Sequence, residues 1–185
     1  MEALFTSTVT VALAEIGDKT QLLTLLLASR FLSRKALISG IAAATVLNHG
    51  ISAWLGSYLG ALIPTSIANY VVGISFVVVG LWLLVPDKDE AATGRFDHFG
   101  AFCATFILFS LAEIGDKTQV ATVLLGAEYH SVLWVTVGTT VGMLLANVPV
   151  IYLGEKLLCR LPVKWVQLIA AGLFVAMGIA TMWWG

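Results

Sequence analysis

The stretch LAEIGDKTQ occurs at Leu13–Gln21 and again, unchanged, at Leu111–Gln119. Each copy places a Glu, an Asp and a Lys inside an otherwise apolar run. Charged groups cost free energy in such a position, roughly 2.5–3.5 kcal/mol each at the centre of a membrane helix. The repeated stretch therefore indicates both a duplicated architecture and a functional site.

The composition around the two copies is typical of an integral membrane protein. Of the 185 residues, 59% are hydrophobic and 11% are charged, against about 25% charged in soluble domains. The net charge of −1 and the scattered basic residues argue against a nucleic-acid partner. The first apolar run has no basic region before it, so we expect a helix of the mature protein rather than a signal peptide.

The apolar runs predict an all-α membrane protein with six transmembrane helices, because about 20 apolar residues cross a bilayer. The expected spans are about 4–28, 37–60, 66–85, 99–126, 131–154 and 163–184. The polar segment 86–98 is expected to be a cytoplasmic linker between a first unit, 1–85, and a second unit, 99–185.

The basic residues predict the orientation in the bilayer. Apart from the two motif lysines, every Lys and Arg falls in an odd-numbered connection between the expected spans or, as Lys164 does, at its edge. By the positive-inside rule these connections are cytoplasmic, and both termini lie on the non-cytoplasmic side.

A constant offset of 98 residues aligns the two halves without a gap. Beyond the motif, it pairs Gly40 with Gly138, Gly56 with Gly154, Pro64 with Pro162 and Gly80 with Gly178. Because each half has an odd number of spans, the second half must be inverted relative to the first. Two inverted three-helix repeats are typical of secondary transporters, whose sites lie near the midplane where the halves meet.

The motif predicts a cation site between the halves. On a continuous helix, Glu15, Asp18 and Gln21 would share one face, and the second copy repeats this stripe. The expected metal ligands are Glu15, Asp18, Glu113 and Asp116, with the amide oxygens of Gln21 and Gln119 beside them. Such oxygen ligands select Ca²⁺, Mg²⁺ or Mn²⁺ over Zn²⁺ or Cu⁺.

The motif lysines are expected to balance charge. Lys19 follows Glu15 by four residues, and Lys117 follows Glu113 by four, which favours an ion pair along one helix. Four acids and two lysines leave two negative charges, which one divalent cation would neutralise.

Several polar residues near the motif have two interpretations each. As further metal ligands or proton-pathway groups we consider Thr20, Thr118, His49, Asn147 and Ser110. Their alternative is ordinary hydrogen bonding between packed helices. Gly17 and Gly115 permit either a close helix crossing or a local unwinding. A purely structural salt-bridge network is a further alternative, although such a network has no reason to keep two excess carboxylates.

The two copies of E-I-G-D-K-T closely resemble the E-x-G-D-(K/R)-(T/S) signature of the Gcr1-dependent translation factor family. That family comprises small cation/proton antiporters, among them Golgi manganese and calcium transporters and bacterial manganese exporters. The resemblance spans nearly the whole chain. It implies cation export with Glu15, Asp18, Glu113 and Asp116 as the metal-binding acids, and no prosthetic group.

The resemblance also bears on location and assembly. Eukaryotic relatives carry targeting extensions and a longer central loop than this sequence has, so we expect a multi-pass protein of the bacterial inner membrane. Some bacterial relatives carry one motif per chain and pair as dimers. With both motifs present here, one chain suffices for a site, and a homodimer stays open.

The function hypothesis is a Mn²⁺ exporter driven by proton entry through alternating access. Hard-ligand chemistry alone leaves Ca²⁺ level with Mn²⁺, so a Ca²⁺/H⁺ antiporter is the first alternative and a passive divalent-cation channel the second. An intramembrane hydrolase with an aspartate dyad fits less well, because each Asp comes with its own Glu and Lys. We therefore expect no enzymatic activity.

Overall fold

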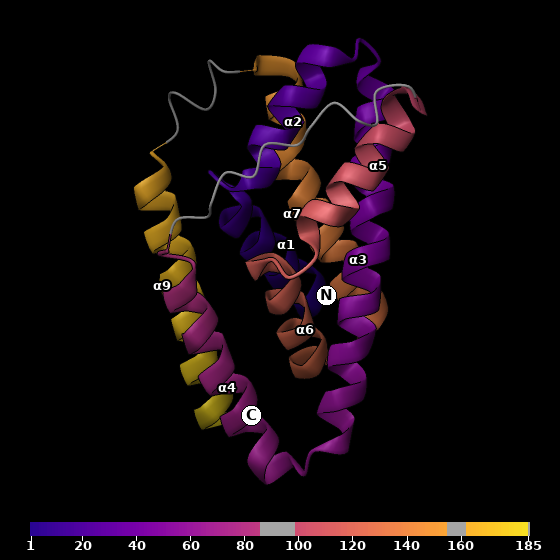
Figure 1. The fold of residues 1–185 in the computed structure, drawn as a ribbon. Helices are drawn as coiled ribbons and strands as arrows, with labels where there is room; N and C mark the ends of the chain where they lie inside the picture. The colour runs from indigo at the N-terminus through magenta and orange to yellow at the C-terminus, as the bar shows by residue number, and fades with distance from the viewer. Residues whose placement is uncertain (86–98, 155–161, 185) are drawn as a thin grey trace.

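The computed structural model describes residues 1–85, 99–154 and 162–184, and all regular elements in these ranges are helices (Figure 1). They are α1 (Glu2–Glu15), α2 (Lys19–Arg30), α3 (Arg34–Leu62), α4 (Thr65–Trp82), α5 (Gly100–Glu113), α6 (Lys117–Tyr129), α7 (Val132–Leu153) and α9 (Val163–Trp184). The predicted all-α class is confirmed. The linker predicted at 86–98 lies outside the described residues.

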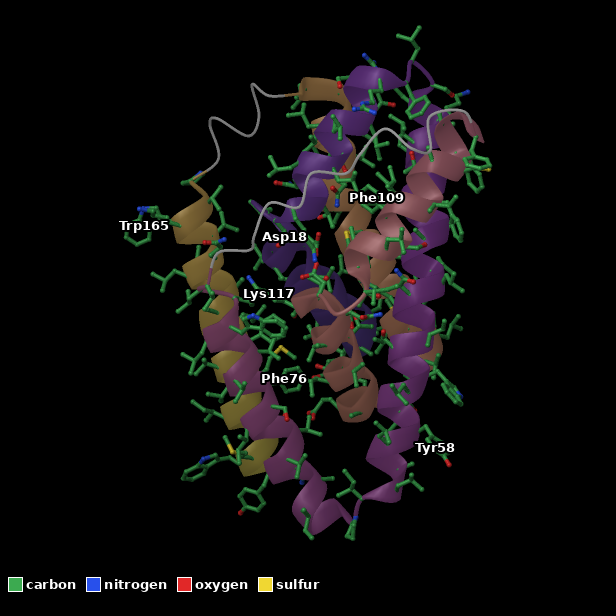
Figure 2. All side chains as sticks on the ribbon, viewed as in Figure 1. Asp18, Tyr58, Phe76, Phe109, Lys117 and Trp165 are labelled. Atoms are coloured by element: carbon green, nitrogen blue, oxygen red, sulfur yellow. The ribbon has the colours of Figure 1, made fainter. Side chains whose placement is uncertain are left out.

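Three of these helices are long and apolar enough to cross a membrane: α3, α7 and the segment Val163–Trp183 of α9. Shorter apolar helices cover Ile67–Trp82 and Gly100–Glu113. Large aromatic side chains project outward from the bundle, including the labelled Tyr58 and Trp165 (Figure 2), which are 53% and 68% exposed. An outer surface of this kind suits lipid, and the chain is a multi-pass membrane protein.

Within the expected spans 4–28 and 99–126, the structure shows local unwinding, one of the two alternatives for Gly17 and Gly115. Each run is interrupted inside its motif copy, between α1 and α2 and between α5 and α6. The physical reason is glycine: Gly17 has φ +85° and Gly115 has φ +75°, a left-handed conformation that ends a helix and that side chains with a Cβ disfavour.

The two halves are interleaved rather than separate. Helix α1 packs against α7, α3 against α5 and α6, and α4 against α9. The crossings are close: a Cβ at Gly138 would lie 2.6 Å from the Leu4 carbonyl oxygen, and one at Gly40 would lie 3.0 Å from the Phe102 carbonyl oxygen. These two contacts are related by the 98-residue offset.

Two apolar clusters form the core of the described residues. The first core cluster consists of Ala3, Ala14, Ala53, Val72, Phe76, Val79, Leu83, Ala121, Leu125, Val135, Ala170 and Phe174. The second core cluster consists of Val11, Leu23, Leu27, Leu37, Ile41, Ala44, Phe109, Met143 and Ile151. In Figure 2, the labelled Asp18 and Lys117 lie between the levels of Phe109 and Phe76, so the motif lies between the two clusters in this view.

Candidate metal centre

Both motif copies fold into the same helix break. Ile16 and Ile114 are extended, with ψ 115° and 118°, and the following glycine turns the chain. Asp18 and Asp116 are then the N-cap residues of α2 and α6. Identical sequence thus gives nearly identical local geometry in two different surroundings.

The glutamines stabilise the breaks. The Gly17 N–H donates to Gln21 Oε1 at 2.9 Å, and the Gly115 N–H donates to Gln119 Oε1 at 2.7 Å. Each side chain therefore replaces a backbone acceptor lost at the break. The expected stripe of two acids and an amide on one helix face is wrong, because the helix does not continue through the motif.

Three carboxylates from the two halves meet in the interior. Glu15 and Glu113 are fully buried, and Asp116 is 3% exposed. One ligand oxygen from each of the three lies within 4.8 Å of the other two, a spacing that a single cation could bridge. Asp18 is also buried, at 8% exposure, but does not belong to this group of three.

Threonines orient the two glutamates. The Thr20 hydroxyl donates to Glu15 Oε2, and the Thr118 hydroxyl donates to Glu113 Oε2 at 3.3 Å. The other oxygen of each glutamate, Oε1, is buried and accepts no hydrogen bond from the described residues. Thr20 and Thr118 thus hold one oxygen of each acid, and the second oxygen can bind a cation.

The lysines do not form the expected pairs along a helix. Lys19 Nζ lies 3.7 Å from Asp116 Oδ1, across the interface between the halves. Lys117 Nζ donates to the Val85 carbonyl oxygen at 2.5 Å, just beyond the end of α4. The break between each Glu and its Lys removes the four-residue helical spacing, so tertiary neighbours replace the local partners.

The repeat-related residues His49 and Asn147 differ in their contacts. His49 is fully buried, and its Nε2 lies 3.3 Å from Glu113 Oε2. Asn147 Oδ1 accepts from the Thr24 hydroxyl at 2.7 Å, and its Nδ2 donates to the Met143 carbonyl oxygen at 3.1 Å. The structure therefore brings His49 to Glu113 and places Asn147 against Thr24 and Met143.

At Ser110 the backbone carbonyl, rather than the side-chain hydroxyl, makes the hydrogen bond: Asn48 Nδ2 donates to this carbonyl oxygen at 3.0 Å. Asn48, Thr24 and Thr122 were not expected at the site. Thr122 Oγ1 lies 3.5 Å from His49 Nδ1 and donates to the Thr118 carbonyl oxygen at 2.8 Å. The 98-residue offset, which relates Thr24 to Thr122, is the sequence signal that could have identified this pair.

A dry cluster of acids at this depth requires compensation. Desolvating ionised carboxylates costs several kcal/mol each, and among the described residues Lys19 lies 3.7 Å from one of them, Asp116. A divalent cation or bound protons can supply further positive charge. The oxygen-rich donor set suits a hard cation.

A family model described as "Divalent cation/proton antiporter GDT1" matches residues 3–91 and 101–185. The chain belongs to this GDT1 family. The resemblance seen in the sequence is confirmed, and the GDT1 assignment makes the protein a divalent cation/proton antiporter rather than an enzyme.

Relatives of this GDT1 protein include bacterial and plant chains. A Vibrio cholerae protein named "Putative manganese exporter" is 48% identical over 98% of this chain and 90% of its own length. A GDT1-like protein of Synechocystis is 27% identical over 94% of this chain and 93% of its own. GDT1-like protein 3 of Oryza sativa is 27% identical over 97% of this chain and 73% of its own. No solved structure matches.

Proposed function

We propose that this protein exports Mn²⁺ from the cytoplasm in exchange for protons, by alternating access to a site formed by Glu15, Asp18, Glu113 and Asp116. The observation that carries the proposal is the group of three buried carboxylates contributed by both halves, with ligand oxygens within 4.8 Å of one another. Net negative charge draws in the cation. Protons entering from the other side neutralise the acids and release it.

The proposed architecture is a pair of inverted three-helix repeats, 1–85 and 99–185, in which α1–α2 and α5–α6 each act as one broken span. Equivalent helix crossings at Gly40 and Gly138 support it, as does the match of the family model to two segments. Broken helices facing each other at a repeat interface are the usual ion site of such transporters. We place the protein in a bacterial inner membrane with both termini on the non-cytoplasmic side.

The choice of Mn²⁺ over Ca²⁺ draws on two supports. The Vibrio cholerae relative is named for manganese export, and His49 offers a nitrogen beside Glu113. Imidazole suits transition metals better than Ca²⁺, which takes oxygen ligands. A Ca²⁺/H⁺ antiporter that uses the same acids is the alternative.

His49→Ala is expected to weaken Mn²⁺ binding several-fold more than Ca²⁺ binding, because only Mn²⁺ gains from the nitrogen. Asn147→Ala is the matched control at the repeat-related position. It leaves the Thr24 hydroxyl without its acceptor, which costs about 1–3 kcal/mol, so it should lower the melting temperature more than it changes the Mn²⁺/Ca²⁺ ratio. Cation-dependent thermal shifts in detergent measure both quantities. Equal loss of Mn²⁺ and Ca²⁺ binding in His49→Ala would contradict a selective role for this residue.

The transport proposal is tested in membrane vesicles that expose the cytoplasmic face. With an acidic lumen, radioactive Mn²⁺ should accumulate, the uptake should saturate, and a lumenal pH dye should report proton loss in step. Mn²⁺ uptake without proton movement would refute the coupling. Uptake that does not saturate and ignores the pH gradient would indicate a channel, and stronger uptake of Ca²⁺ than of Mn²⁺ would favour the calcium alternative.

A further inference from the structure

We propose that α4 and α9 form one rigid unit that moves between two repeat-related positions, and that the structure holds this unit in the position nearer the non-cytoplasmic side. The inference rests on the proposed function, which requires access from alternate sides. It adds the identity of the moving part and the state that the structure represents.

The α4–α9 pair has the close packing of a rigid unit. A Cβ at Gly73 would lie 2.6 Å from the Gly178 carbonyl oxygen, and one at Gly80 would lie 3.0 Å from the Ala171 carbonyl oxygen. Backbones this close resist sliding. Phe76 of α4 and Phe174 of α9, which are repeat-related, also pack with ring centroids 6.1 Å apart. Figure 1 shows the two helices side by side along one flank of the bundle.

The unit is attached to the rest of the bundle near the chain termini. The Thr10 hydroxyl contacts Met177 Sδ at 3.7 Å, which joins α1 to α9. Helix α6 packs against α4, the other helix of the unit. Helices α1 and α6 thus form the position that the unit now occupies, and by the proposed topology this lies toward the non-cytoplasmic side.

The two core clusters differ in whether they contain residues of the α4–α9 unit. Four members of the first core cluster have repeat partners in the second: Ala121 with Leu23, Leu125 with Leu27, Val135 with Leu37, and Ala53 with Ile151. The first cluster also contains Val72, Phe76, Ala170 and Phe174 of the α4–α9 unit. Among the described residues, the second cluster contains none from α4 or α9. The second cluster is therefore an equivalent packing surface without the unit.

Another pair of repeat-related helix contacts is tight on the side of the unit and loose on the opposite side. A Cβ at Gly56 of α3 would overlap the backbone of Val123 in α6, whereas at the equivalent position, Gly154, the nearest atom of the described residues is Leu25 Cδ1 at 3.9 Å. The α3–α6 contact near the unit is thus tight and its counterpart between α7 and α2 is loose. Closure at one end and separation at the other is the expected asymmetry of a transporter in one of its two states.

Lys117 links the site to this unit. Lys117 is buried, at 4% exposure, and its Nζ donates to the Val85 carbonyl oxygen that follows α4. The repeat-related bond would join Lys19 to the Trp183 carbonyl oxygen at the end of α9. In the structure Lys19 contacts Asp116 instead. The bond from Lys117 to Val85 thus ties one motif copy to the end of the α4–α9 unit.

Cysteine pairs test the motion in the full-length protein in vesicles, in a background with Cys103→Ser and Cys159→Ser. Thr10→Cys with Met177→Cys joins the unit to its present position, and Val79→Cys with Leu108→Cys is the repeat-related pair for the other position. With a short bis-methanethiosulfonate reagent, both pairs should cross-link. Each cross-link should reduce Mn²⁺ uptake to the level of vesicles without the protein, and reduction should restore it.

Two controls keep the outcome decisive. Phe76→Cys with Phe174→Cys lies inside the unit, so its cross-link should leave transport intact, and each single variant must transport before its pair is scored. Failure of the Val79–Leu108 pair to cross-link in an actively transporting protein would overturn the moving unit while leaving the proposed function intact. Transport that persists with the Thr10–Met177 pair fully cross-linked would also overturn the moving unit and leave the proposed function intact. If both pairs cross-link in a protein that transports neither Mn²⁺ nor Ca²⁺, the proposed transport function is refuted, whereas the proposed motion of the unit stands.

Discussion

Glu113→Gln is expected to abolish proton-coupled Mn²⁺ transport and to weaken Mn²⁺ binding by about tenfold or more. Glu113 is fully buried, and its Oε2 is already held by Thr118 and His49. Its free Oε1 is the oxygen left to bind a cation. Removing the charge takes away a charge-assisted ligand worth about 1.5–3 kcal/mol, and tenfold in affinity corresponds to about 1.4 kcal/mol. Glutamine also cannot carry the exchanged proton.

The aspartates should differ from each other in the same experiment. Asp116 shares the group of three close carboxylates, and Asp18 does not. Asp116→Asn should therefore weaken Mn²⁺ binding more than Asp18→Asn in the state that the structure represents. Isothermal titration in detergent gives the affinities, and vesicle uptake gives the rates. Glu2→Gln, at an exposed position outside the site, is the control for loss of one carboxylate. Full-rate transport by Glu113→Gln would remove the site from consideration.

Alanine at the two motif glycines is expected to give the largest loss of stability, and to give it unequally. Both positions have a positive φ, so a Cβ at either costs about 1–2 kcal/mol. At Gly17 the new Cβ would also overlap Val163 Cγ1 at the start of α9, whereas at Gly115 it would meet no atom of the described residues within 4 Å. Gly17→Ala should therefore lower the melting temperature more than Gly115→Ala, with about 2–4 °C for each kcal/mol.

A compensating variant separates the cost of the strained backbone at Gly17 from the cost of overlap between the new Cβ and Val163. Val163→Ala removes both γ-carbons, so Gly17→Ala with Val163→Ala should recover the part of the loss caused by contact with α9. The double variant should then approach Gly115→Ala. Thermal unfolding in detergent, with Val163→Ala alone as control, measures the difference. Equal destabilisation by the two glycine variants would mean that α9 does not rest on the first break.

The sequence by itself determined the membrane class, the duplication at an offset of 98 residues and the residue types at the site. These follow from composition and from a short identical motif, and each is a property of the chain that packing cannot alter. The motif also contained the information for the helix break, since a glycine after an isoleucine and before a capping aspartate ends one helix and starts the next. A continuous amphipathic stripe was the wrong interpretation because it counted helical positions through Gly17 and Gly115.

The tertiary structure decided which contacts each of the two identical motif copies makes. Lys19 and Lys117 are equivalent in sequence, and the structure brings Lys19 to Asp116 and Lys117 to the Val85 carbonyl oxygen. His49 and Asn147 already differ in sequence, and the structure adds which group each one meets: Glu113 for His49, and Thr24 and Met143 for Asn147. Local sequence fixes local conformation, so both breaks look alike. The partner of each side chain depends on how α4 and α9 pack against the rest of the bundle, and a single asymmetric packing gives equal residues unequal neighbours.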